Sequence, residues 1–488
     1  MSTAAENLPH VQPAPPPAAA PVDEIQRIFA AQQLRANRLR NSTADERIAR
    51  LKKMKTAIME RTQEIYDAGA ADFGKPEPEV DLTEIMPVIS EINDAVRHLK
   101  KWMKPKKVAA TLTLLGTSSH IQYEPKGVAL IIAPWNYPIN LCLGPLVSAI
   151  AAGCTAILKP SEMTPHSSAF MQKLVEDLFT EDEVAMFQGG PEVSTALLDL
   201  PFDHIFFTGS PQIGKVVMTA AAKHLTSVTL ELGGKSPFIV DKSANIKDTA
   251  QKLAWGKGVN NGQTCIAPDH VYVHEDVREE LISRLRERWG EVYGKDTAAV
   301  KASPDYARMV NARHHGRVVS MLEDAKAKGG KVVIGGGSDR ADNFFEPTVV
   351  TDVGDDTLVM QEEIFGPVLP MRSFRDISEP IAEINARPKP LALYMFGKDQ
   401  KVIDKVMKET AAGTTCINHC MIQFLHGNLP FGGVNNSGIG HAHGHHGFLA
   451  FSHERPVVRD HFSSVWMFFP PYTGFIRKLI KLTVRWLA

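Results

Sequence analysis

Cysteine is scarce in this chain. Five cysteines occur among 488 residues, an odd and sparse set that does not make a disulfide framework and favours reduced thiols in a cytoplasmic compartment. They are Cys142, Cys154, Cys265, Cys416 and Cys420. Cys416 and Cys420 are spaced as CxxxC, with no second cysteine pair to complete a zinc site. We expect no metal there and interpret both as small buried hydrophobic residues.

An excess of charge of one sign is also missing. The chain has 54 Lys and Arg against 55 Asp and Glu, a net charge of -1, so no global field would recruit nucleic acid. The segment 1–21 lacks the basic and apolar regions of a signal peptide. Its Pro/Ala bias predicts a disordered, solvated tail, with order beginning near Val22.

Helical patterns fill the first hundred residues. A chain of 488 residues, 44% hydrophobic, is long enough for at least two domains. Thr43 followed by Glu46 predicts a capping box that opens a long amphipathic helix. A second helical run continues to Met103. The segment 108–127 is rich in β-branched residues and predicts the strands of a hairpin.

After Gly127, buried strands alternate with helices. "VALIIAP", "TAILKPSE" and "HIFFTGS" are apolar runs separated by helical segments. Strand, helix and strand with short loops predict a parallel sheet with crossover helices. A similar alternation resumes at Pro237. We therefore expect two parallel-sheet α/β domains plus a small β element.

The segment 207–215, "FTGSPQIGK", fits the G-x-x-x-x-G-K pattern of a phosphate-binding loop. That motif needs Ser or Thr next, to hold magnesium, and the residue here is Val216. The standard dinucleotide fingerprint G-x-G-x-x-G follows none of the strands. What remains is a glycine-containing turn between a strand and a helix, whose N–H groups suit a phosphate.

Six motifs then occur in an order that resembles a known family. They are PWNYP (134–138), KPSE (159–162), FTGS (207–210), LELGGKSP (230–237), NNGQTC (260–265) and EEIFGP (362–367). Together they resemble the NAD(P)-dependent aldehyde dehydrogenase superfamily. PFGGVNNSGIG (430–440) and FSHERPVV (451–458) resemble its class 3 branch, which includes fatty aldehyde and coniferyl aldehyde dehydrogenases. The resemblance covers about residues 22–460.

The resemblance implies an aldehyde dehydrogenase-like fold and its division into domains. The segments 22–103 and 126–233 would form the cofactor-binding domain and 234–420 the catalytic domain. The segments 104–125 and 421–460 would form a bridging element through which the chain makes a homodimer. The segment 461–488 would be a C-terminal tail.

Catalytic roles follow from the same motifs. Oxidation of an aldehyde to an acid needs a nucleophile that adds to the carbonyl, and a thiolate suits this step. We expect Cys265 in an exposed loop at the domain junction as that nucleophile. The side-chain amide of Asn136 and the backbone N–H of Cys265 would bind the oxyanion. Glu231 would activate the water that hydrolyses the thioester.

The resemblance also assigns the cofactor and substrate sites. The residues expected at NAD, with NADP possible, are Trp135, Lys159, Glu162, Gly209, Ser210, Glu363 and Phe365. A carboxylate at Glu162 accepts a hydrogen bond from a ribose 2′-OH and repels a 2′-phosphate, which favours NAD. Tyr137, Ile266 and Phe431 would form an apolar pocket suited to long aliphatic or phenylpropanoid aldehydes.

Two other functions are possible for a chain with this resemblance. An acylating dehydrogenase would release the thioester to coenzyme A, but relatives of that kind tend to lack the glutamate found here at position 231. A binding or structural protein that kept the fold would not need Cys265, Glu231 and Asn136 intact.

Histidines and a basic tail complete the sequence. The run "GHAHGHHG" holds His441, His443, His445 and His446, and only His443 matches the class 3 pattern. We expect histidines at the surface or at the substrate mouth rather than a metal site. After Gly474, one helical face carries Arg477, Lys478, Lys481 and Arg485, and the opposite face carries Ile476, Leu479, Ile480, Trp486 and Leu487. Such a helix either lies on a membrane surface or packs on a subunit.

Overall fold

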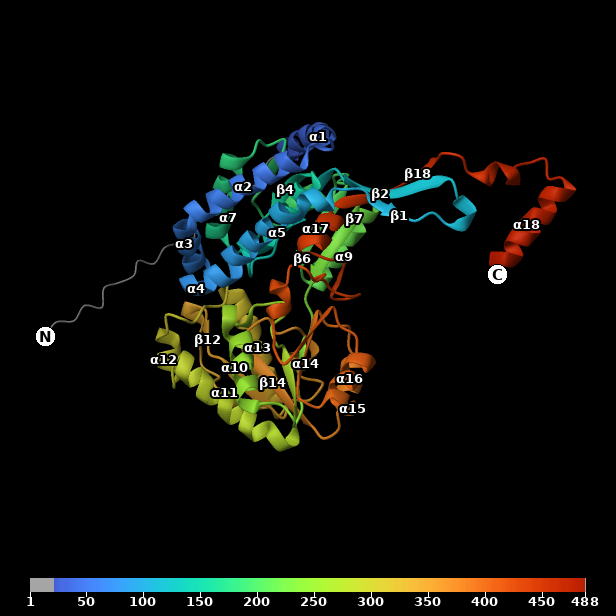
Figure 1. Ribbon diagram of the computed structural model, residues 1–488. Coiled ribbons are helices and arrows are strands. Elements are labelled where there is room, and N and C mark those ends of the chain that lie inside the picture. Colours follow the sequence, from blue (N-terminus) through green and yellow to red (C-terminus); the bar gives the residue numbers. More distant parts are fainter. Residues whose placement is uncertain (1–21, 488) are drawn as a thin grey trace.

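The computed structural model describes residues 22–487 of the chain. Two α/β bodies lie one above the other, and a thin β arm projects from the upper body toward the C-terminal helix (Figure 1). The predicted tail at 1–21 lies outside the described residues. The predicted fold class, two parallel-sheet α/β domains with a small β element, is confirmed.

Helices of the N-terminal segment cover the upper body. They are α1 (Val22–Leu39), α2 (Ala44–Glu60), α3 (Thr62–Phe73), α4 (Glu77–Val80) and α5 (Met86–Trp102), with a π-helical turn, η1 (Asp81–Ile85), before α5. The predicted capping box is present, because Glu46 N–H donates to Thr43 Oγ1 at 3.3 Å and Thr43 N–H donates to Glu46 Oε2 at 2.6 Å. The helix that it opens is shorter than expected. Arg61 leaves helical geometry, and the Thr62 hydroxyl donates to Met59 O at 2.8 Å, a bond that competes with the helical ladder.

The sheet of the upper body has the order β17-β7-β6-β3-β4-β5. Its strands are β17 (Gly438–Ile439), β7 (Ser227–Leu232), β6 (His204–Gly209), β3 (Val128–Ile132), β4 (Thr155–Lys159) and β5 (Val184–Met186). All neighbours are parallel except the edge strand β17, which is antiparallel to β7. The helices α6 (Pro138–Ala152), α7 (Pro165–Leu178), α8 (Pro191–Leu198) and α9 (Pro211–Ala222) alternate with the strands. Every residue of β3 and β4 is buried, as expected of a parallel sheet covered on both faces.

The lower body contains a seven-stranded sheet of order β10-β13-β14-β9-β8-β15-β16. Its strands are β10 (Lys331–Ile334), β13 (Thr348–Thr351), β14 (Val368–Phe374), β9 (His270–His274), β8 (Pro237–Val240), β15 (Ala392–Phe396) and β16 (Thr414–Ile417). Its helices are α10 (Ile246–Gly258), α11 (Arg278–Val292), α12 (Thr297–Ala302), α13 (Ala312–Ala327), α14 (Leu358–Gln361), α15 (Ser378–Asn385) and α16 (Gln400–Glu409). A short ribbon pairs β11 (Ser338–Asp339) with β12 (Phe344–Phe345). Only β10 runs antiparallel in the large sheet.

The arm is a three-stranded antiparallel sheet. The predicted hairpin is present as β1 (Lys106–Val108) and β2 (Thr117–Pro125), and β18 (Ser452–Asp460) pairs with β2 along nine residues. The segment 421–460, expected to form one bridging unit, is divided in the structure. β17 joins the sheet of the upper body and α17 (Gly444–Ala450) packs on α6, whereas β18 joins the arm.

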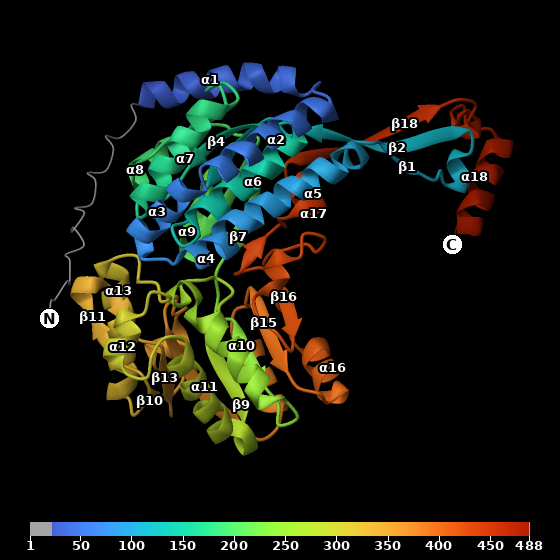
Figure 2. The same cartoon turned by 60° about the vertical axis from the view of Figure 1, so that its left-hand side comes forward.

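Beyond the arm the chain ends in a separate helix, α18 (Gly474–Leu487), which both views show away from the two bodies (Figures 1 and 2). Between residues 22 and 487, no helix is both long enough and apolar enough to cross a membrane.

Candidate active site

The predicted catalytic residues converge where the two bodies meet. Glu231 lies near the carboxyl end of β7 and is level with Thr208 in the neighbouring strand β6. Asn136 follows β3, so it lies at the same end of the sheet. Cys265 comes from the other body, in the loop that follows α10. Carboxyl ends of parallel strands form one edge, which is where open α/β sheets bind ligands.

The loop that leads to Cys265 has an unusual backbone. Asn260, Asn261 and Gly262 have φ values of 50°, 53° and 71°, all in the left-handed region. This region costs an ordinary residue on the order of 1–2 kcal/mol, so surrounding contacts must hold it. The side-chain amide of Asn261 donates to Ala307 O at 3.0 Å, and the side-chain amide of Gln263 donates to Asn260 O at 2.9 Å. A β-carbon at position 262 would lie 2.4 Å from the carbonyl oxygen of Gly366, so glycine is required there.

The expectation of an exposed nucleophile loop is wrong. Residues 259–264 are buried and Cys265 is half-buried. Small polar residues suggested a solvated loop, but here the side-chain N–H groups of Asn260, Asn261 and Gln263 find acceptors inside the protein. Burial, together with the nearby carboxyls of Glu363 and Glu231, raises the pKa of Cys265 to about 12. In this arrangement the sulfur is a thiol, and a neighbouring base or positive charge must favour the thiolate.

Glu231 and Asn136 are both buried, with 6% and 3% of their surfaces exposed. Neither carboxyl oxygen of Glu231 has a hydrogen-bond partner among the described residues. Burial without compensation therefore raises the pKa of Glu231 well above its ordinary value. The side-chain amide of Asn136 donates to Gln263 O at 3.0 Å, which fixes its orientation and leaves its second N–H for another acceptor.

A cavity of about 630 Å³ opens on one side of Cys265 and Glu231. Of the residues predicted at the cofactor, its lining includes Trp135, Gly209, Ser210, Glu363 and Phe365. The rings of Trp135 and Phe365 meet edge to face at 5.2 Å between centroids. Burial beside Asp269 raises the pKa of Glu363 to about 8.

The other two predicted cofactor residues, Lys159 and Glu162, are not part of this lining. Lys159 is buried at the end of β4, and its Nζ lies 3.2 Å from Glu162 Oε2.

Ser210 caps the twelve-residue helix α9, where its Oγ accepts a hydrogen bond from Ile213 N–H at 3.4 Å. The positive end of α9 therefore faces the cavity.

A second, narrow cavity of about 40 Å³ lies on the other side of Cys265 and Glu231. Its lining is mainly apolar and includes Leu141, Pro145, Phe206, Phe424 and Phe431. Of the predicted substrate residues, Phe431 lines it. Ile266 is instead buried in the core of the lower body, and the Tyr137 hydroxyl lies 2.5 Å from Thr264 Oγ1.

The narrow cavity is also lined by a polar pair, Glu91 and His443, of which the sequence indicated only His443. His443 Nδ1 lies 2.7 Å from Glu91 Oε1, and the His443 ring meets Phe424 edge to face at 4.6 Å between centroids. The motif indicated His443, but nothing in the sequence marked Glu91, which is 352 positions away. His445 stacks on Phe448 instead. The structure places no metal-binding group of three His, Cys, Asp or Glu side chains within residues 22–487.

Lys235 and Arg317 also line the large cavity and were not anticipated. The ammonium of Lys235 pairs with Asp269 and donates to Val359 O at 2.8 Å and Glu362 O at 2.9 Å. Arg317 donates to Glu363 O at 3.1 Å. Both hold the backbone of the EEIFGP motif beside the cavity. The lysine lies within a motif, but Arg317 had no recognisable signal.

Known proteins match along nearly the whole chain. The model of the aldehyde dehydrogenase family matches residues 14–457. The 4,4′-diaponeurosporen-aldehyde dehydrogenase of Staphylococcus aureus is 43% identical over 428 residues, 87% of this chain and 91% of that protein. A Pseudomonas aeruginosa protein named "Probable coniferyl aldehyde dehydrogenase" is 40% identical over 469 residues, 95% of this chain and 97% of that protein.

A solved structure agrees with the sequence comparisons. The substrate-bound state of Staphylococcus aureus AldH superimposes with a TM-score of 0.90 and 40% identity, covering 94% of this chain and 99% of that one. With this match, the family match and the motifs in their order, the chain belongs to the aldehyde dehydrogenase family, whose members are oxidoreductases that act on aldehydes.

Proposed function

We propose that this aldehyde dehydrogenase oxidises long, apolar aldehydes to carboxylic acids with NAD(P). The observation that carries the proposal is the placement of Cys265 and Glu231 on the boundary between two unlike cavities. The large one has mixed walls with several charged side chains, and the narrow one has mainly apolar walls. The large cavity would hold the cofactor and the narrow one the apolar part of the aldehyde. A nucleophile and a base between them suit a hydride transfer followed by hydrolysis.

The large cavity has the features that a dinucleotide requires. The N-terminal end of α9, with Ser210 as its cap, offers N–H groups to a pyrophosphate. Gly233 faces Glu363 so closely that a β-carbon there would lie 2.2 Å from that carboxylate. Trp135 and Phe365 provide aromatic surface near Cys265. Lys159 and Glu162 would hold the adenosine ribose, and the Glu162 carboxylate favours NAD over NADP.

Each proposed catalytic residue has a defined task. As a thiolate, the Cys265 sulfur forms a bond to the aldehyde carbon while the carbonyl oxygen becomes an oxyanion, held by the free amide N–H of Asn136 and the backbone N–H of Cys265. NAD(P), held by the residues named above, would supply the acceptor for the hydride that leaves this carbon. Collapse of the oxyanion then leaves a thioester on Cys265. Glu231 removes a proton from water, the water oxygen bonds to the acyl carbon, and the sulfur departs as the acid forms.

The water-activating carboxyl argues against coenzyme A as the acyl acceptor. Glu231 is buried against the cavity, and none of residues 22–487 forms a hydrogen bond to its carboxyl oxygens, as expected of a group that acts on a transient water. An acylating enzyme has no use for this base. We therefore propose hydrolysis, with turnover that does not require coenzyme A.

The substrate class is proposed from the narrow cavity. Its walls are mainly aliphatic and aromatic, and two of its polar members, Glu91 and His443, are paired with each other. A slender apolar chain or a flat aromatic ring would lose little by leaving water for such walls. The two relatives named above carry the names of a long polyene aldehyde and of a phenylpropanoid aldehyde, which supports the same two classes.

Replacing Cys265 with Ala tests the chemistry. The variant should lose turnover while retaining NAD binding, because the proposed cofactor contacts do not use the sulfur. Calorimetry measures the binding, and NADH absorbance measures the turnover. A panel of aldehydes from propanal to hexadecanal, with coniferyl aldehyde, should show kcat/KM rising with apolar surface. Retained turnover in Cys265→Ala would remove this residue as the nucleophile.

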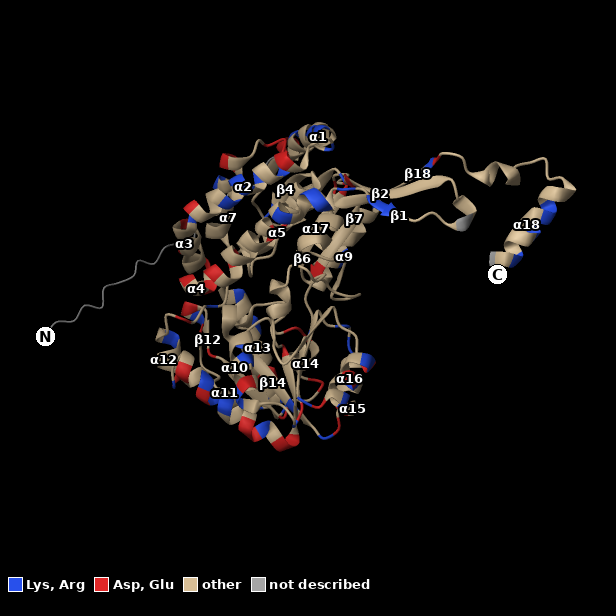
Figure 3. Ribbon diagram, in the orientation of Figure 1, with Lys and Arg blue, Asp and Glu red and all other residues tan. Residues whose placement is uncertain are grey.

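We further propose that two chains associate through the arm and that α18 meets an anionic membrane surface. Each strand at the outer edges of the arm is largely exposed, and an arm of three strands has little core of its own. The segment 461–488 carries four basic and no acidic residues, and Figure 3 shows blue but no red segments along α18. Cytoplasmic location with peripheral membrane contact would suit a poorly soluble aldehyde.

A further inference from the structure

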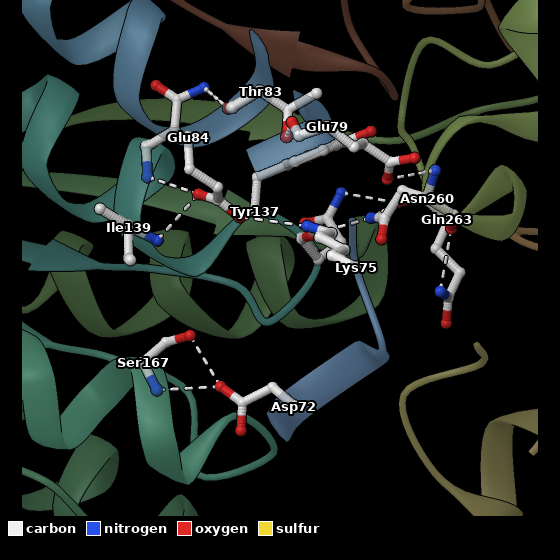
Figure 4. Close-up of polar contacts among 12 residues, drawn as sticks. Asp72, Lys75, Glu79, Thr83, Glu84, Tyr137, Ile139, Ser167, Asn260 and Gln263 are labelled. Carbon is white, nitrogen blue, oxygen red and sulfur yellow. Dashed lines mark hydrogen bonds and ion pairs between the residues drawn. The ribbon is translucent and has the colours of Figure 1, made fainter. Parts of the chain in front are cut away.

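A polar network from the N-terminal helices reaches between the two proposed catalytic loops (Figure 4). Its centre is Lys75, which follows α3 and has a side chain with no exposed surface. Lys75 Nζ lies 3.1 Å from Glu84 Oε1 and 3.1 Å from the carbonyl oxygen of Asn136. It also lies 4.5 Å from the ring centroids of Phe73 and Tyr137. A buried ammonium needs such partners, because isolated charge is strongly disfavoured in the interior.

Glu84 connects this network to the start of α6. Its Oε2 accepts hydrogen bonds from Ile139 N–H at 3.1 Å and Asn140 N–H at 2.9 Å. A carboxylate at a helix N-terminus satisfies N–H groups that have no partner in the helix and interacts favourably with its dipole. Because α6 begins at Pro138, two residues after Asn136, this capping fixes the loop that presents the Asn136 amide.

Glu79 connects the same helices to the loop from the other body. It lies in α4, and its Oε1 accepts a hydrogen bond from Asn260 N–H at 2.8 Å. Asn260 is the first of the residues with left-handed backbone before Cys265. Its side-chain amide donates to the Asn136 carbonyl oxygen at 2.8 Å, the oxygen that Lys75 also contacts. The loop of Asn260 is therefore joined to the loop of Asn136 through the Asn136 carbonyl oxygen. Lys75 contacts this oxygen, and Glu79 contacts Asn260.

The Asn260 N–H needs this partner from outside its own loop. With a left-handed backbone at 260 and 261, the loop cannot continue the ladder of α10. An N–H without a partner in this interior would be destabilising and would leave the loop free to adopt an ordinary backbone. Glu79 does not line either cavity, and no proposed chemical step uses it.

We propose that Glu79 is a positioning residue, whose carboxylate holds the Asn260 N–H and thereby keeps Cys265 aligned with Asn136 across the two bodies. The proposal rests on the roles assigned above to Cys265 and Asn136. It gives the N-terminal helices a function in the reaction, because α4 of the upper body then orients the nucleophile of the lower body. Lys75 and Glu84 act from the opposite side, on the oxyanion-binding loop.

Glu79 is the residue to test, because removing one member of the fully buried Lys75–Glu84 pair is expected to disturb folding itself. Glu79→Ala deletes the acceptor, Glu79→Gln keeps an acceptor oxygen without charge, and Glu77→Ala removes an exposed carboxylate from the same short helix. The measurements are kcat per cofactor-binding site, with the sites counted by calorimetry using NAD, and the Kd of NAD. Counting sites removes any loss that comes only from unfolded protein.

Glu79→Ala should lower kcat per site by about 10- to 100-fold, as expected when a reacting atom is displaced by roughly an ångström. The Kd of NAD should not change. Glu79→Gln should restore most of kcat, and Glu77→Ala should match the parent enzyme. A kcat per site in Glu79→Ala equal to that of the parent would overturn the proposal, and so would a loss in Glu79→Gln as large as in Glu79→Ala.

The Cys265→Ala variant separates this proposal from the assigned chemistry. If that variant remains active, the nucleophile assignment fails, and the Glu79 proposal loses its basis. If it is inactive while Glu79→Ala is fully active, the chemistry stands and only the positioning role is overturned.

Discussion

Glu231 is the residue whose protonation should govern the pH dependence of turnover. Burial raises the pKa of its carboxyl well above the ordinary value, and the neutral acid cannot accept a proton from water. The ionised fraction grows as the pH rises through this raised pKa. We therefore expect kcat to increase with pH across that transition, as measured by steady-state rates with a saturating aldehyde.

Glu231→Gln is the matched variant for this group, since it keeps the shape and removes the base. It should remain acylated after one hydride transfer, and intact-mass spectrometry after mixing with aldehyde and NAD should detect the acyl-enzyme. Its residual rate should no longer rise with pH. Normal turnover without acyl-enzyme would assign water activation to another group, of which Glu363 is a candidate because it lines the same cavity and has a pKa of about 8.

The candidate catalytic residues could be predicted from the sequence because each lies in a short motif of neighbouring residues. Cys265, Glu231 and Asn136 each lie in a short motif of recognisable composition, and the structure brings all three together. Glu79 and Glu91 had no such signal. Their partners are 181 and 352 positions away, and a carboxylate in a short or amphipathic helix is ordinarily a solvated residue. The burial of the nucleophile loop was missed for a related reason, because its partners come from distant segments.

At the scale of elements, the sequence periodicity predicted which segments are strands and which are helices. It did not predict where some of these elements end. Apolar runs predicted β3, β4 and β6, since strands buried on both faces leave a continuous apolar pattern. At the break between α2 and α3, Arg61 leaves helical geometry and the Thr62 hydroxyl bonds to Met59 O, while the amphipathic pattern of the sequence continues. The pairing of β18 with β2 joins segments more than 300 positions apart, which no local pattern could indicate.

The helix α18 is the element with the clearest unpartnered surface. Large apolar side chains are exposed along it and the segment before it, at Phe462, Trp466, Phe469, Tyr472, Phe475, Leu482, Val484 and Trp486. Aromatic residues beside lysine and arginine suit a membrane interface. Near an anionic surface each basic residue contributes on the order of 1 kcal/mol, and this attraction weakens with salt.

Truncation after Pro471 should abolish membrane binding. The full chain should co-sediment with vesicles that contain anionic lipid at low salt and dissociate at high salt, while the truncated chain stays in the supernatant. Reversing Lys478 and Lys481 to Glu in the full chain should act like the truncation if charge directs the contact. Should the full chain also stay in the supernatant, and truncation lower the Tm or the oligomeric mass, α18 is a packing element and the membrane proposal fails.

At the scale of the whole molecule, the arm of a single chain leaves apolar side chains exposed on one face. Val108 in β1 and Val458 in β18 both lie level with Ser119 of the central strand β2, so their side chains share one face. Both are exposed, at 46% and 59%. Apolar side chains that lie together on an exposed face indicate a surface that another protein covers. A second copy of the chain would cover this face.

Charge on that face should therefore prevent association. The parent enzyme is expected to sediment with twice the 53.6 kDa mass of one chain, and Val108→Lys with Val458→Lys should shift it to the mass of one. Arg459→Ala is the control, because Arg459 is exposed beside Val458 but points to the opposite face of its strand. It should leave the dimer intact. A parent enzyme with the mass of one chain, or a double variant that remains a dimer, would show that the arm does not join two subunits.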